Sequence, residues 1–252
     1  MKRIWPFLAI MLFCSHLVYA QQGTFDEANT LLERGELTEA LAMYRSIEYD
    51  GQVSGALFLN MGITAMQLDS LGLAKYYFLK SREFDTTNEQ AVLALDYVNS
   101  QFSRQSATLP KLPWDRAIEW INNEITAFGV LLIGFMITLS GLTLLYLGWL
   151  DKLPLSRIFP YLLGLIITGT AIAALAFYAD YVNQRYDGAV LTSTSQRVLE
   201  QPDHESALIS IAYEGYDITV DHWKSKEKEN WIYIRLENGQ FGWAQNEGIE
   251  IL

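Results

Sequence analysis

The sequence predicts a multi-domain membrane protein made of an all-α repeat module, two transmembrane helices and a small all-β barrel. Three observations support this prediction. Two long runs near the middle of the chain contain no charged residue, the segment before them repeats with a period of 34 residues, and the segment after them alternates short apolar runs with turns. The chain has 252 residues and a formal net charge of −11, so an average over its length hides parts of different character.

The two uncharged runs extend over residues 125–150 and 158–179. At a rise of 1.5 Å per residue, helices over these runs are roughly 39 and 33 Å long, enough to cross a hydrocarbon core of about 30 Å. Gly134, Gly141 and Gly148 recur every seven positions on one stripe, which favours close packing either between the two spans or with another membrane subunit. Neither run contains an ionisable side chain, which disfavours a transporter or a channel.

Residues 1–20 have the basic, apolar and small-residue regions of a secretory signal peptide, with cleavage expected after Ala20. A lipoprotein would need a small residue before Cys14, whereas Phe13 stands there. An uncleaved segment would keep its basic end in the cytoplasm, so the chain after it is exported in either case. The spans then place the loop 151–157 in the cytoplasm and both soluble parts in the periplasm. We expect a two-pass protein of the bacterial inner membrane.

Similar residues lie 34 positions apart in the segment 22–105. The pairs are Ala28 with Gly62, Ala40 with Ala74, and Tyr44 with Phe78. The small members let the two helices of a hairpin touch, and the aromatic members fill the gap between successive hairpins. This segment resembles a tetratricopeptide module of two repeats and a capping helix. Two repeats lie below the usual minimum of about three, so the module is expected to lean on a partner, on a second copy or on the membrane.

The tetratricopeptide resemblance implies an inner groove that holds a peptide or a helix. The residues that it places in this groove are Phe25, Asn29, Leu32, Leu59, Ile63, Met66, Leu93 and Tyr97. The alternative is that these side chains only pack against one another and the capping helix, and it applies above all to Leu59, Ile63 and Leu93. The basic residues with which some members of the family clamp a terminal carboxylate are absent from this face, which disfavours that ligand class.

Residues 106–124 are predicted to link the repeats to the membrane. The prolines and polar residues of the first half indicate an extended tether. From Trp114 onward, Ile118, Ile121 and Ile125 fall on one side of a helix that carries polar residues elsewhere. This pattern is typical of an interfacial helix that leads into a bilayer.

Residues 187–252 contain five short β-type runs separated by turns, which predicts a barrel of SH3 size. The string WIYIRLENGQFGWA, residues 231–244, has a Trp-led strand, an Asn-Gly turn and a Gly-Trp pair, and resembles the bacterial SH3 pattern. The stretch QRVLEQPD, residues 196–203, departs from that pattern, which disfavours a conventional cell-wall site. The aromatic residues from which a ligand surface could be built are Tyr213, Tyr216, Trp223, Trp231, Tyr233 and Trp243. About half of them are expected to fill the core.

Both soluble parts are acidic, with a net charge of −7 over residues 21–124 and again over residues 186–252. Such parts repel polyanions, so nucleic acid is not an expected partner. The three histidines lack ligand spacing and the single cysteine lies in the signal segment, so neither a metal nor a cofactor is expected. The sequence has no nucleophile triad, no paired carboxylates in an apolar setting and no Gly-rich phosphate loop, and we do not expect an enzyme.

The order of signal segment, repeat module, two spans and SH3-like domain resembles the E proteins of the Bat (aerotolerance) operons of bacteria. This resemblance implies a scaffold in an envelope complex with membrane-bound von Willebrand-type domain proteins and a MoxR-type ATPase, in a process related to oxidative stress. The first hypothesis is therefore a non-catalytic envelope scaffold that recruits proteins through the repeat groove and the barrel. The alternative is a sensor or tether that binds peptidoglycan through the barrel. Assembly into a homo-oligomer is left open.

Overall fold

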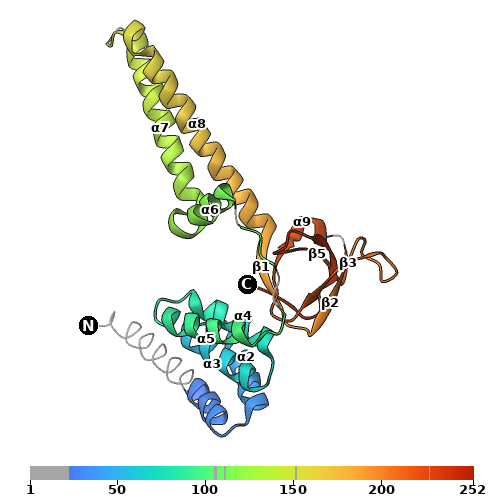
Figure 1. Ribbon diagram of the computed structural model, residues 1–252. Coiled ribbons are helices and arrows are strands. Elements are labelled where there is room, and N and C mark those ends of the chain that lie inside the picture. Colours follow the sequence, from blue (N-terminus) through green and yellow to red (C-terminus); the bar gives the residue numbers. More distant parts are fainter. Residues whose placement is uncertain (1–22, 105–106, 111, 151, 227) are drawn as a thin grey trace, which may run out of the picture. The chain divides into compact units, whose positions relative to one another are not determined.

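A computed structural model describes residues 23–104, 107–110, 112–150, 152–226 and 228–252 (Figure 1). The expected signal peptide, residues 1–20, lies outside the described residues. The chain divides into two compact units. The first combines the N-terminal part up to Ala107 with Gly188–Val220 and Lys224–Leu252, and the second combines Thr108–Asp187 with Asp221–Trp223. The predicted combination of a helical region, two apolar helices and a C-terminal antiparallel sheet is confirmed.

The helical part of the first unit consists of antiparallel hairpins that stack on one another (Figure 1). Its helices are 23–33, α2 (Leu37–Tyr49), α3 (Gly55–Gln67), α4 (Leu71–Arg82) and α5 (Asn88–Gln101). Ser54 caps the N-terminus of α3, because its hydroxyl accepts a hydrogen bond from the Leu57 amide at 3.1 Å and satisfies one of the free donors of the first turn. Within residues 23–104 of the described structure no second helix pairs with α5, so the array ends there on a single helix.

The 34-residue period is present in the backbone of both hairpin turns. Gly35 and Asp69 lie 34 positions apart and both have positive φ angles, +77° and +58°. In each turn the following amide closes the same hydrogen bond, from Glu36 to the Leu31 carbonyl at 2.9 Å and from Ser70 to the Ala65 carbonyl at 3.0 Å. The repeated sequence therefore folds into a repeated structure, helix by helix and turn by turn.

The core of the helical part is built on the residue pairs that the sequence singled out. The small and aromatic members are all buried: Ala28, Ala40, Tyr44, Gly62, Ala74 and Phe78. A Cβ atom added at Gly62 would lie 2.4 Å from the Phe78 ring, so the glycine leaves the space that this ring fills. Small residues thus admit aromatic ones, which bury a large apolar area.

The second unit contains an amphipathic segment that precedes two long apolar helices. It consists of α6 (Pro113–Trp120) and a π-helical turn, η1 (Ile121–Ile125). Ile118 and Ile121 are buried, as their shared face requires, and they pack with Ala176 and Ala179. Thr126 then breaks the helix with a φ of +68°, and its hydroxyl accepts a hydrogen bond from the Gly129 amide at 3.2 Å.

Two helices long and apolar enough to cross a membrane follow, α7 (Ala127–Trp149) and α8 (Leu155–Arg185). They run side by side as a hairpin (Figure 1). A Cβ atom at Gly134 would lie 2.7 Å from the Gly169 carbonyl oxygen and 2.7 Å from the Ala173 amide nitrogen. The glycine stripe therefore packs between the two spans, the first of the two arrangements that the sequence left open. The α8 helix continues beyond the uncharged run and passes directly into the first strand.

The C-terminal part of the first unit is an antiparallel sheet whose strands curl round a common interior (Figure 1). Its strands are β1 (Tyr186–Leu191), β2 (Ser195–Leu199), β3 (Leu208–Tyr213), β4 (Asp217–Asp221), β5 (Trp231–Leu236), β6 (Phe241–Gln245) and β7 (Ile249–Ile251). Their order in the sheet is β3-β2-β6-β5-β4-β1-β7. Buried aliphatic residues from most of these strands form the core, among them Leu191, Val198, Val220 and Ile234.

The sheet differs from the expected one in two respects. It has seven strands rather than five, because β2 and β7 were not expected from the sequence. In addition, a short helix, α9 (His222–Ser225), follows β4 directly and includes the first residues of the charged stretch 224–230. The Ser225 hydroxyl in α9 accepts a hydrogen bond from the Tyr233 amide at 2.9 Å, which fixes the helical turn to β5.

Candidate interaction surfaces

The predicted groove residues lie on the first helix of each repeat, at equivalent positions. Phe25, Leu59 and Leu93 form one series with a spacing of 34, and Asn29, Ile63 and Tyr97 form a second. The members in the first two helices are partly buried against the core of the array, as are Leu32 and Met66. The same positions on α5 are open, with Leu93 65% and Tyr97 55% exposed. The structure therefore separates six packed residues from two exposed ones.

Asn29 has a structural role within the array. Its side-chain oxygen accepts hydrogen bonds from the Tyr44 hydroxyl at 2.7 Å and from the Asn60 amide at 2.8 Å. Phe25 packs on the same tyrosine, with 5.9 Å between ring centroids. Burial raises the pKa of Tyr44, so the phenol keeps its proton and its donor role. Asn29 thus links the first hairpin to α3 of the second, whereas Phe25 packs within the first hairpin.

The exposed apolar face of α5 is made by Leu93 and Tyr97, which are four residues apart and share one side of the helix, together with neighbouring Val92. On α3, the residues equivalent to Leu93 and Tyr97 pack against neighbouring helices. After α5 the chain turns to an extended backbone at Phe102, and the described part of the array, residues 23–104, contains no later helix. We call Val92, Leu93 and Tyr97 the open face.

Sequence reasoning did not find the contact between α4 and the turn that joins β3 to β4. Lys75 is buried, and its ammonium group donates to the Gly215 carbonyl at 2.7 Å and pairs with the Asp217 carboxylate at 2.8 Å. The Gly72 amide at the start of α4 donates to a Glu214 carboxylate oxygen at 2.7 Å. We call this set of contacts the seam.

Two glycines make the close approach at the seam feasible. A Cβ atom at Gly215 would lie 2.2 Å from the Phe102 ring, and its φ of +80° also favours glycine. A Cβ atom at Gly72 would lie 2.6 Å from the Leu191 carbonyl oxygen. Phe102 lies 113 positions before Gly215 in the chain, so no local sequence pattern indicates this contact.

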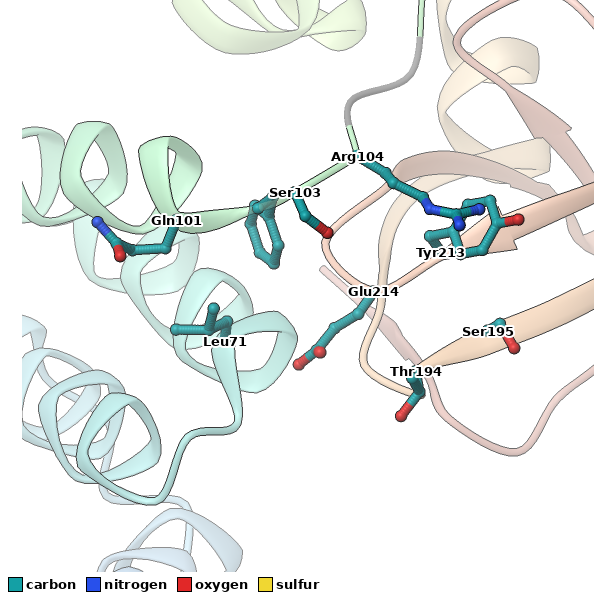
Figure 2. Close-up of a pocket in the computed structure, with 9 residues that line it drawn as sticks. Leu71, Gln101, Ser103, Arg104, Thr194, Ser195, Tyr213 and Glu214 are labelled. Atoms are coloured by element: carbon teal, nitrogen blue, oxygen red, sulfur yellow. The ribbon is translucent and has the colours of Figure 1, made fainter.

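A cavity of about 340 Å³ lies at the seam (Figure 2). It is lined by Leu71, Gln101, Phe102, Ser103, Arg104, Thr194, Ser195, Tyr213 and Glu214. The Arg104 guanidinium lies 4.1 Å from the centroid of the Tyr213 ring, and Glu214 points toward the start of α4. These contacts make the cavity part of the joint between the helices and the sheet.

The six aromatic residues predicted as one ligand surface separate into groups. Tyr213 packs edge-on against Tyr216 at 5.8 Å, beside the seam. Tyr233 and Trp243 are register partners on β5 and β6, with ring centroids 5.3 Å apart. Trp231 lies two residues before Tyr233 on the same side of β5 and packs against His204 at 5.1 Å. Trp231, Tyr233 and Trp243 form one aromatic row along the sheet.

Trp223 belongs to a different cluster, in the second unit. Its ring packs edge-on against Tyr181 of α8, with 5.1 Å between centroids. Arg185, at the end of α8, donates to one carboxylate oxygen of Asp221 at 2.7 and 3.1 Å and also bonds the Tyr181 hydroxyl. Nearby, a ring nitrogen of His222 lies 2.8 Å from the Asp187 carboxylate. The cluster joins the last turn of α8 to the start of α9.

Among the residues that the structure describes, no group of three or more His, Cys, Asp or Glu side chains could hold a metal ion.

Comparison of the chain with models of known protein families, with curated proteins and with solved structures found no match.

Proposed function

We propose that this protein is a membrane-anchored, non-catalytic scaffold of the bacterial envelope, in which the open face of α5 recruits a partner protein. The observation that carries the proposal is the exposure of Leu93 and Tyr97 at repeat positions whose equivalents on α3 are packed. A helical array that stops on an apolar helix face offers the surface on which another helix would normally stack.

The surroundings of the open face favour one kind of partner. Glu89 and Asp96 are exposed on the same helix, so the apolar surface has an acidic rim. An amphipathic helix whose apolar side is flanked by Lys or Arg would complement both features. The resemblance to the Bat E proteins suggests membrane proteins with von Willebrand-type domains as the source of such a helix.

The membrane part of the proposal is supported by the two apolar helices, and the seam supports a hairpin topology. Lys75 precedes both spans and Asp217 follows them, yet the buried Lys75 ammonium group pairs with the partly exposed Asp217 carboxylate at 2.8 Å. Residues in contact share one compartment, so the chain between them crosses the membrane an even number of times. The exported N-terminus that the sequence predicts would then put both soluble parts in the periplasm.

The recruiting role can be tested by photo-crosslinking in cells that produce the full chain. With p-benzoylphenylalanine in place of Tyr97, we expect a discrete adduct that disappears when Leu93→Glu is added, because the charge disrupts apolar docking. The same photoreactive residue in place of Tyr49, which is exposed on α2, is the control. Equal adducts at both positions, or an adduct that persists with Leu93→Glu, would contradict recruitment by the open face.

Peptidoglycan binding is a second candidate function, favoured by the aromatic row on β5 and β6. The rings of Trp231, Tyr233 and Trp243 lie along one side of the sheet, where flat side chains can stack on sugar rings. The detergent-solubilised chain should then co-sediment with purified cell wall, and the double variant Tyr233→Ala/Trp243→Ala should stay in the supernatant. If the wall retains that variant as well as it retains Tyr49→Ala, the aromatic row does not bind it.

A further inference from the structure

We propose that Trp223 is a membrane-interface anchor, whose indole ring lies among the lipid headgroups at the outer end of α8. This inference rests on the proposed membrane insertion of α7 and α8. It assigns to a lipid surface a residue that the sequence placed in the ligand surface of the β domain.

The depth of Trp223 follows from its contact with Tyr181. The uncharged run of α8 ends at Ala179, and Tyr181 lies two residues later, about 3 Å further along the helix axis. The headgroup region on each side of the hydrocarbon core is roughly 5 to 8 Å thick. Tyr181 therefore falls within that region, and Trp223 packs edge-on against it at 5.1 Å.

The exposed part of Trp223 has no protein cover in the described structure, since the side chain is 55% exposed. It extends an aromatic group that already lies on α8, where Tyr178 and Tyr181 stack with 6.4 Å between centroids. Tyr and Trp are enriched at this depth because their rings are apolar while their hydroxyl and indole N–H groups hydrogen-bond to water and headgroups. An exposed Trp added to such a group matches the interface chemically.

Charged groups mark the aqueous side of the same cluster. Arg185 lies six residues after Ala179, about 9 Å further along the helix, and its guanidinium is 5.7 Å from the centroid of the Trp223 ring. Its partner Asp221 is buried, so the ion pair is held in place just beyond the rings. Trp223 is thus next to an apolar helix on one side and next to a charged pair on the other.

A second element reaches the same depth on α8. Ile118 of α6 and Ile121 of η1 pack against Ala176 and Ala179, which form the last turn of the uncharged run. Trp120, beside them on α6, is exposed. The amphipathic segment before α7 and the α9 turn therefore both meet α8 at the level where its apolar surface ends.

The test measures depth with fluorescent probes on the full chain in lipid nanodiscs, in a Cys14→Ser background. A probe is attached at Trp223→Cys, at Ile167→Cys near the middle of α8, or at Phe241→Cys, a residue of β6 that is 58% exposed. Nitroxide groups are placed either on the lipid headgroup or deep on the acyl chain. We expect the probe at position 223 to be quenched about twofold more strongly by the headgroup nitroxide than by the deep one, and the probe at 167 to show the reverse.

The outcomes distinguish this inference from the proposed membrane insertion. If the probe at 167 is not quenched by the deep nitroxide, the insertion of α8 is wrong and the anchor falls with it. If the probe at 167 behaves as expected while the probe at 223 is quenched no more than the one at 241, only the anchor is wrong. A probe at Lys224→Cys, adjacent in α9, repeats the measurement with Trp223 intact and should respond as the probe at 223 does.

Discussion

The helical array of the first unit and the hairpin of two long apolar helices in the second both bring helices together through glycine, but the glycines admit different partners. In the array, Gly62 leaves room for the Phe78 ring. In the hairpin, Gly134 leaves room for the backbone of Gly169 and Ala173. One glycine accommodates a side chain, and the other accommodates a helix.

The proposed insertion of α7 and α8 into a membrane accounts for this difference, because it gives the two regions different solvents. In water, burying an aromatic ring removes apolar area from solvent and stabilises the fold, so the space beside a glycine is best filled by the largest ring that fits. In lipid, this gain is absent because the acyl chains are as apolar as the side chains, and association depends on close packing of the helices themselves. The same residue type therefore serves two different energetic purposes in one chain.

The largest expected effect tests the ring packing in the array. The valine side chain of Gly62→Val would overlap the space that the buried Phe78 ring fills. We expect this variant to lower the free energy of unfolding of the helical part by about 3 kcal/mol. Thermal unfolding of the full chain in detergent, followed by circular dichroism, measures the loss. Gly23→Val is the matched control, since nothing lies within 4 Å of a Cβ atom there. Similar losses in both variants would show that the ring contact does not set the stability.

The second prediction tests the backbone contact in the hairpin. Gly134→Val should force α7 and α8 apart at their closest approach and destabilise the pair by about 2 kcal/mol. Titration with SDS in mixed micelles, followed by tryptophan fluorescence, should show unfolding at a lower SDS fraction. Gly164→Val, on an open side of α8, should leave the transition unchanged. If Gly164→Val lowers the SDS fraction of unfolding as much as Gly134→Val does, the backbone contact at Gly134 does not set the stability of the hairpin.

The third prediction asks whether the array is stabilised by polar contacts as well as by rings. Lys75→Met keeps most of the side-chain volume but leaves the buried Gly215 carbonyl without its donor, which should cost about 1 to 2 kcal/mol. Differential scanning calorimetry on the full chain compares it with Lys226→Met, an exposed lysine. An unchanged melting temperature for Lys75→Met would mean that the seam adds nothing to the stability of the first unit.

The smallest effect concerns Glu250 on β7. Burial raises the pKa of Glu250 above its ordinary value of 4.5, although nearby Arg45 opposes the shift. The folded state therefore favours the protonated form, and stability falls as the pH rises above 4.5 toward neutrality. Glu250→Gln should raise the melting temperature at pH 7, and the gain should vanish below pH 4.5. An equal gain at both pH values, or the same profile for the exposed Glu247→Gln, would exclude the titration of Glu250 as the cause.

Much of the architecture could be predicted because its signals are local. The uncharged runs of α7 and α8 identify themselves by length, and the pairs 34 positions apart place both helical hairpins. The amphipathic pattern of Ile118 and Ile121 likewise indicated which face of α6 and η1 is buried. In each case the residues that carry the pattern also make the contact.

The missed features depend on contacts between distant residues. Strand β7 has only three residues and is held by its pairing with β1, where Ala189 faces Ile251. Strand β2 lies in a stretch that looked like a degraded motif, and its pairing with β3 organises it. At the seam, Gly72 and Glu214 are separated by 142 positions, so no window of sequence contains both. For the predicted groove residues, the repeat pattern did not distinguish packed positions from open ones, because packing depends on which helix lies beside each face.

The corner at Thr126 is a point of stored conformational energy. A β-branched residue with φ +68° and ψ 149° occupies a region that such side chains avoid, at a cost on the order of 1 to 3 kcal/mol. Straightening residues 113–149 into one continuous helix would release that energy, and the packing of Ile118 and Ile121 against Ala176 and Ala179 of α8 opposes it. The bent conformation is therefore strained, and a change that weakens this packing would favour the straight conformation of residues 113–149.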